Sequence, residues 1–251
     1  SVDLNSTVSL PMLWVPSGTF TMGSPTTEAG RQADREDEHN VSLTKGFYLG
    51  KYEVTQAQYQ AVMTGNTDSL SATPSTRYNG NANRPVETVS WNDIQIFLSR
   101  LNAQQSANIP AGWSYVLPTE AEWEYACRAG TTTAYSWGDN ISASDANWNH
   151  GNDANQTENV GQYSANSWGF FDMHGNLREW TADRYAAYSS GAQTDPEGSA
   201  SGSARVLRGG AWNFAGTYLR SASRRNGYNP GGRSNYFGFR VGFQEQSADV
   251  A

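Results

Sequence analysis

The chain has 251 residues, of which 37 % are hydrophobic, and its formal net charge is -7 at pH 7. This length can close one sizeable core, and the acidic balance argues against a general nucleic-acid binder, because phosphate contact needs a basic face. The single cysteine excludes an internal disulfide, and no run of about 18 apolar residues is available to span a membrane.

The chain contains 25 glycines, which indicate many turns and short helices and strands rather than long helices. Three predicted helices begin with a hydroxyl residue followed three positions later by an acceptor, as in a capping box: Thr55 with Gln58, Ser90 with Asp93, and Thr119 with Glu122. We expect helices over residues 56–63, 91–102 and 120–129, and strands over 19–22, 41–43, 47–52, 205–207 and 239–243. After residue 137 no helical period is sustained, so that half is expected to be mostly irregular.

Charge is unevenly distributed, because residues 205–240 contain seven arginines and neither Asp nor Glu. Two explanations compete: an exposed anion-binding surface, or guanidinium groups that pair with carboxylates from elsewhere in the chain. Buried charges need partners, so pairing with carboxylates from elsewhere is favoured for four arginines: Arg208, Arg220, Arg224 and Arg240. Examples of such carboxylates are Glu53, Glu120, Glu122 and Glu179.

Short phrases follow one another in a fixed order: TMGS (21–24), GKYEVT (50–55), RPV (84–86), VSW (89–91), LPTEAEWEYA (117–126), WG (137–138), ANW (146–148), DMHGNLREW (172–180), RGGAW (208–212), LRSA (219–222) and GFRV (238–241). Together they resemble the formylglycine-generating enzyme family, also called the sulfatase-modifying-factor domain. The resemblance implies an α+β, C-type-lectin-like fold for a single domain over residues 1–251, with short helices, short strands and much irregular structure.

In family enzymes that oxidise a sulfatase cysteine, this tail carries a serine and two thiols that bind copper. The resemblance places those positions at Ala211, Phe214 and Leu219, and none of these side chains supplies the thiolate that copper(I) favours. Cys127 is the only thiol, and we expect it to be buried and inert in the third helix. The sequence therefore predicts a scaffold without a catalytic cofactor and without enzyme activity.

In the tail, residues 205–243, the family phrases RGGAW, LRSA and GFRV are separated by segments rich in Tyr, Ser, Asn and Gly. This composition is typical of antibody paratopes. It also resembles the variable proteins of diversity-generating retroelements, in which such positions between fixed phrases are randomised. The alternative is a static tail whose loops are merely polar. The candidate ligand-binding residues are Phe214, Thr217, Tyr218, Ser223, Arg225, Asn226, Tyr228, Ser234, Asn235 and Tyr236.

A structural calcium is suggested by a Gly-Asn turn in which carboxylates and backbone carbonyls could converge. The resemblance implies Asp172, Gly175, Leu177 and Glu179 as its ligands, and a second site at Asn147, the Trp148 carbonyl and an acid such as Asp153. An ordinary turn capped by Asx side chains is the competing interpretation of both.

The histidines provide a weaker metal candidate. His150 and His174 with a carboxylate could in principle form a two-histidine iron site, although their spacing gives no support. His39 lies in the charge run at 35–39, which is typical of a solvated loop.

The favoured function is a non-catalytic variable protein that displays its tail to a protein or glycan ligand, with no nucleic-acid partner. Such a role implies a bacterial cell-surface or secreted location, with membrane attachment through a removed lipid anchor as one route. A metal-dependent oxidase of the same family is the alternative. Formylglycine generation through a rearranged site is a third interpretation.

Overall fold

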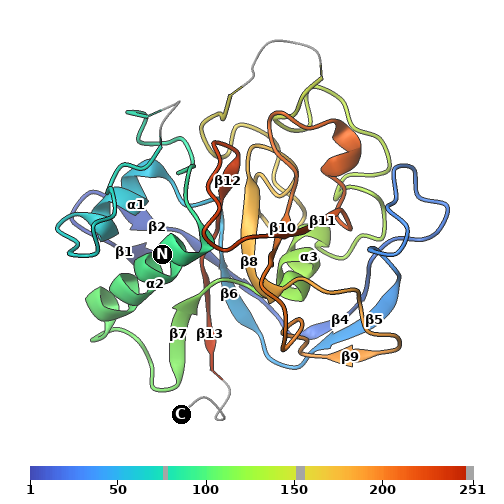
Figure 1. Cartoon of the computed structure of the whole chain (residues 1–251), viewed down its shortest axis with the longest axis horizontal. Coiled ribbons are helices and arrows are strands. Elements are labelled where there is room, and N and C mark those ends of the chain that lie inside the picture. The colour runs from blue at the N-terminus through green and yellow to red at the C-terminus, as the bar shows by residue number, and fades with distance from the viewer. Residues whose placement is uncertain (76–78, 151–155, 247–251) are drawn as a thin grey trace.

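The computed structural model of the chain describes residues 1–75, 79–150 and 156–246 (Figure 1). Within them lie two four-stranded sheets, one three-stranded sheet and one two-stranded sheet, with long connections between short strands. The predicted α+β architecture with much irregular structure is confirmed.

One four-stranded sheet, here called the tail sheet because the tail supplies three of its strands, has the order β11-β10-β8-β12. Strands β10 and β8 are antiparallel, whereas β12 pairs with β8 in parallel. The second four-stranded sheet has the order β3-β6-β13-β7, and the smaller sheets are β4-β5-β9 and β1-β2. The strands are β1 Val2–Asp3, β2 Ser9–Leu10, β3 Met12–Val15, β4 Gly18–Met22, β5 His39–Leu43, β6 Phe47–Gly50, β7 Trp113–Val116, β8 Arg178–Arg184, β9 Gln193–Thr194, β10 Arg205–Arg208, β11 Arg224–Tyr228, β12 Phe237–Gly238 and β13 Gly242–Glu245.

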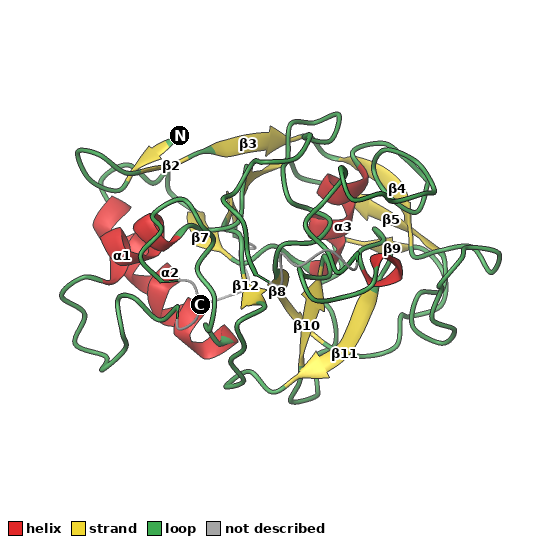
Figure 2. Ribbon diagram, turned by 90° about the horizontal axis from the view of Figure 1, so that it is seen from above, coloured by secondary structure: helices red, strands yellow, loops and turns green. Residues whose placement is uncertain are grey.

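All three predicted helices are present: α1 Gln56–Met63, α2 Trp91–Gln105 and α3 Glu120–Arg128. Each starts with the predicted capping box, in which the hydroxyl accepts from the third helical amide and that residue's side chain accepts from the cap amide. Figure 2 shows α1 and α2 together at one end of the molecule and α3 in the other half, near β4 and β5.

Two large apolar clusters form the core. One packs α1 and α2 against the tail sheet, β11-β10-β8-β12. It includes Phe97, Trp180 and Phe239, none of which is exposed to solvent. The other surrounds α3 and includes Trp123 and Phe47. The tail thus contributes to the core with its framework residues, which fixes the backbone from which its other side chains project.

Two strand predictions are corrected. The longest strand, β8, lies in the half that was expected to be irregular, and its charged residues, such as Glu179 and Asp183, are buried. The strand predicted over 239–243 is mostly wrong: only Gly242 and Phe243 lie in β13, while residues 239–241 connect β12 to β13. The Phe239 and Val241 carbonyls accept hydrogen bonds from the Val54 and Gly50 amides outside a strand ladder.

No helix among the described residues is both long enough and apolar enough to cross a membrane.

Candidate functional site

Buried ion pairs attach the tail to α3. Arg208, in β10, pairs with both Glu120 and Glu124 of this helix. Arg224, in β11, pairs with Glu120 at 2.7 Å. Both arginines are at most 2 % exposed, so the pairing predicted from the charge distribution is confirmed at Glu120. Glu124 was not predicted as a partner.

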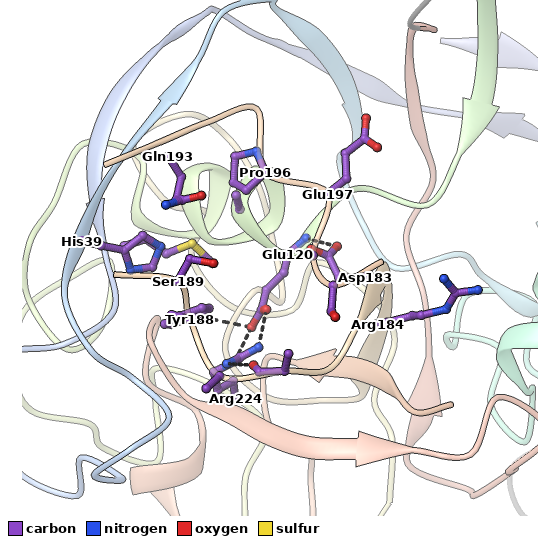
Figure 3. A pocket seen from close by; sticks show the side chains of 16 residues that line it. His39, Glu120, Asp183, Arg184, Tyr188, Ser189, Gln193, Pro196, Glu197 and Arg224 are labelled. Carbon is purple, nitrogen blue, oxygen red and sulfur yellow. Dashed lines mark hydrogen bonds and ion pairs between the residues drawn. The ribbon is translucent and has the colours of Figure 1, made fainter. Parts of the chain in front are cut away.

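A small polar pocket of about 220 Å³ lies beside this network, and Figure 3 shows it from close by. The Tyr188 hydroxyl donates to Glu120 at 3.2 Å, and the Asp183 carboxylate accepts from the Glu120 amide at 2.6 Å. Burial, followed by the nearby Glu120, raises the pKa of Asp183 well above its usual value. Because the Glu120 carboxylate is already bound by two arginines and a tyrosine, we interpret this network as structural support for the tail.

The other two of the four arginines predicted to be paired, Arg220 and Arg240, contact different parts of the chain. Arg240 and Glu179 form a two-pronged contact, with Nε to Oε2 at 2.6 Å and Nη2 to Oε1 at 2.7 Å. The pairing predicted for Arg220 is confirmed as well, although its partners, Glu28 and Glu36 of the loop between β4 and β5, are not among the acids named as examples. Glu36, predicted to be solvated within a charge run, is completely buried because it neutralises Arg220.

Two candidate acids have other partners. Glu53 accepts from the Leu177 amide at 2.9 Å and from Asn176 Nδ2 at 2.7 Å, and Glu122 closes the capping box of α3.

His39 also differs from its prediction, which placed it in a solvated loop. It is the first residue of β5, and its ring centroid lies 4.6 Å from that of Tyr188.

The candidate ligand-binding side chains mostly lie at the surface of the tail. Thr217 is exposed, and seven others are half-buried: Phe214, Tyr218, Arg225, Tyr228, Ser234, Asn235 and Tyr236. Ser223 is a correction, because it is only 4 % exposed, next to the ion-paired Arg224. Asn226 belongs to β11, but its side chain lies outside the described part of the structure.

The aromatic residues of this surface form one group. The Phe214 ring centroid lies 5.9 Å from that of Tyr218 and 5.4 Å from that of Tyr236, in both cases edge to face. Tyr228 and Tyr236 each contact the buried Phe237 at 4.9 and 4.8 Å. We call Phe214, Tyr218, Tyr228 and Tyr236 the aromatic group. Two of its rings pack on Phe237 of β12, and all four side chains are half-buried, an arrangement suited to recognition.

The predicted calcium ligands lie close together, but one of them, Glu179, is already paired with an arginine. Glu179 binds Arg240 through both oxygens and also accepts from Trp123 Nε1 at 2.9 Å. Asp172 accepts from the Gly161 amide at 2.7 Å, and burial raises its pKa to about 6. The Gly175 amide donates to the Gly209 carbonyl. Arg240 therefore supplies a positive charge where calcium was expected, and the calcium site itself stays a prediction.

The other metal predictions gain no further ligands. Asn147 donates to the Gln156 carbonyl and to Asn176, the Trp148 carbonyl accepts from the His150 amide, and Asp153 lies outside the described residues. Across residues 1–75, 79–150 and 156–246, no three His, Cys, Asp or Glu side chains are grouped so that they could hold a metal ion.

Comparison with known proteins identifies the family. The family model of the sulfatase-modifying factor enzyme 1-like domain matches residues 5–244. The chain belongs to this family. Over 91 % of its length it is 32 % identical to serine/threonine-protein kinase pkn1 of Chlamydia caviae, of which it spans only 37 %.

Two further similarities concern function. The formylglycine-generating enzyme of Streptomyces coelicolor is 33 % identical over 64 % of this chain and 53 % of its own. The structure of Treponema denticola variable protein 1 is similar with a TM-score of 0.77 and 28 % identity, over 94 % of this chain and 96 % of that one. The resemblance to variable proteins predicted from the tail is thereby confirmed at the level of structure.

The positions that correspond to the serine and thiols of the sulfatase-modifying-factor enzymes are filled by packed side chains. Ala211 and Leu219 have no exposed surface, and Leu219 belongs to a small cluster against which Phe214 packs. Neither a nucleophile nor a thiolate occupies any of these three positions, so the copper chemistry of those enzymes has no ligands there.

The single thiol of this family member is buried, as predicted. Cys127 has no exposed surface, and burial raises its pKa to about 12. Its Sγ lies 3.5 Å from Nε2 of the buried His174. His174 Nδ1 contacts the Leu219 carbonyl at 2.7 Å, while Nε2 accepts from the Ser136 amide at 3.2 Å, so the neutral ring links the tail to the 136 loop.

This histidine makes stability depend on pH. The pKa of His174 is lowered from 6.5 to about 4, mainly by burial; the Leu219 hydrogen bond opposes this shift and the nearby Arg128 adds to it. The contribution of the neutral ring is complete above pH 6.5 and is lost as the pH falls through 4. We expect wild type to lose roughly 3 kcal/mol more than His174→Gln between pH 7 and 4, measured by urea unfolding. Parallel pH profiles of the two proteins would contradict this assignment.

Proposed function

We propose that this chain is a non-catalytic ligand-binding protein of the variable-protein type, which displays the side chains of its tail to a protein or glycan at the bacterial cell surface or in secreted form. One observation carries the proposal. Half-buried aromatic and small polar side chains sit on a tail whose backbone is fixed by four buried, ion-paired arginines. Rigid rings on a rigid support supply contact area at low entropic cost.

Two further observations support this function. The similarity to Treponema denticola variable protein 1 extends over nearly the whole length of both chains. The positions of the family's serine and thiols hold Ala211, Phe214 and Leu219, which cannot support the oxidation of a cysteine.

The metal-dependent oxidase is the second candidate, and the identity with a formylglycine-generating enzyme favours it. It would require redox-metal ligands other than the family's thiols. His174 is a poor candidate, because both of its ring nitrogens already have backbone partners.

The proposal predicts where natural variation is concentrated. Sequencing the gene's end across many isolates of the source organism should show substitutions at Phe214, Tyr218, Tyr228 and Tyr236 at a rate at least tenfold that of the framework arginines. The physical reason is that partly exposed side chains change at small cost in stability, whereas buried charges do not. Identical codons at all four aromatic positions in every isolate would contradict a variable-protein role.

A further inference from the structure

One buried arginine of β8, the strand between β10 and β12, differs from the ion-paired arginines described above. Arg178 is the first residue of β8 and lies opposite Phe237 of β12 in the parallel register. Its amide donates to the Tyr236 carbonyl at 2.9 Å, which places its backbone directly under the aromatic group. Its side chain is only 3 % exposed.

Arg178 has no counter-charge. The other arginines with at most 4 % exposure, Arg128, Arg208, Arg220, Arg224 and Arg240, each pair with a carboxylate. Among the described residues no carboxylate and no hydrogen-bond acceptor binds the Arg178 guanidinium, and its Nε is buried without a partner. Polar groups that are buried and unpaired in this way are rare in folded proteins and call for an explanation.

The guanidinium packs against an aromatic ring. Its Cζ lies 4.1 Å from the centroid of the Phe214 ring. Burial lowers the pKa of Arg178 to about 10, against the opposing influence of Tyr228, so the group keeps its charge at neutral pH. The hydroxyls of Tyr218, Tyr228 and Tyr236 make no hydrogen bond within the part of the chain that the structure describes, which leaves three donors near an unpaired cation.

The ring contact alone does not balance the cost of burying this charge. A desolvated cation–π contact stabilises less than the burial of an uncompensated ion costs. A guanidinium that presents its donors as a planar fork is matched by an oxyanion, which can accept two parallel hydrogen bonds.

We infer that Arg178 is the anion-binding centre of the tail, so that the ligand of the proposed recognition surface carries an oxyanion that pairs with this guanidinium. This inference rests on the proposed function and assigns the class of ligand. The tyrosine hydroxyls of the aromatic group donate to the remaining oxygens, and the Phe214 ring holds the guanidinium plane. A carboxylate of an acidic protein or sugar and a phosphate or sulfate ester share this chemistry.

Simple anions test the inference without knowledge of the natural ligand. Thermal unfolding at pH 7 is measured in sodium chloride, acetate or phosphate at one ionic strength. In wild type, about 50 mM acetate or phosphate should raise Tm by roughly 3–5 °C above chloride, and the Arg178 Nε–H signal in NMR spectra should move in parallel. A response to acetate alone assigns a carboxylate ligand, and a response to phosphate alone assigns a phosphate or sulfate ester.

Two variants separate specific binding from a general salt effect. Arg178→Met should abolish the difference between anions and should raise Tm in chloride, because it removes an unpaired buried charge. Arg233→Met, which removes a partly exposed charge of the same tail outside the candidate ligand-binding residues, should keep the difference. The inference is overturned if wild type and Arg178→Met respond equally to the anions, or if Arg178→Met lowers Tm in chloride. If the anions stabilise wild type as expected but the tail sequence is the same in every isolate, the proposed variable-protein function is rejected while the anion site at Arg178 stands.

Discussion

Arg240→Met is expected to lower the free energy of unfolding by about 3–5 kcal/mol, because it leaves a buried carboxylate without its counter-charge. Glu179 is fully buried, and Arg240 binds both of its oxygens. Two further acids, Glu53 and Asp172, also lie close enough to Arg240 to raise its pKa. Removing the arginine therefore leaves three carboxylates around one buried position. Urea unfolding followed by tryptophan fluorescence measures the loss.

A double-mutant cycle shows whether the pair acts as a unit. Glu179→Gln should destabilise the protein as well, and the variant that carries both changes should lose clearly less than the sum of the two single losses. Arg233→Met is the matched control, since this arginine pairs with Asp93 while its side chain remains 48 % exposed. Its loss should stay within about 1 kcal/mol. Equal losses for Arg240→Met and Arg233→Met would show that the buried pair does not fix the tail.

Local sequence signals predicted the helices well. A hydroxyl cap and its acceptor lie within four residues, so the signal at Thr55, Ser90 and Thr119 needs no knowledge of the rest of the fold. The strand β8 was missed for the opposite reason. Four of its seven residues are charged, which is untypical of a buried strand, and only the tertiary partners of Glu179 and Asp183 allow these two to be buried.

The candidate site was predictable only in part. The excess of arginine in the tail correctly indicated buried pairs, but the partners of Arg220 come from a loop 184 residues away whose acids read as solvated. The aromatic group was predicted from composition, whereas Ser223 shows that small polar residues in the same segment can face inward. Arg178 was missed entirely, because no sequence pattern shows that one buried arginine lacks a carboxylate.

The structure divides the tail into two classes of position with different tolerance to substitution. Partly exposed side chains cost roughly 0.5 kcal/mol or less each when changed, so several changes together remain within the stability of a folded domain. The framework residues are buried charges or tightly packed. Gly210, for example, adopts a φ of +72°, and a Cβ there would lie 2.6 Å from Leu219 Cδ1. A single change at such a position lowers the free energy of unfolding by a large fraction of its total.

Two matched libraries on a display platform test this division most directly. One randomises Phe214, Thr217, Tyr218, Tyr228, Ser234, Asn235 and Tyr236 together, and the other randomises Arg208, Gly210, Ala211, Leu219, Arg220, Arg224 and Arg240. Survival of a protease challenge reports the folded fraction of each library. The account predicts that most clones of the first library stay folded and that fewer than about one in a hundred of the second do, since each of its changes costs several kcal/mol. Equal survival of the two libraries would contradict the claim that the tail is a rigid frame carrying a replaceable recognition surface.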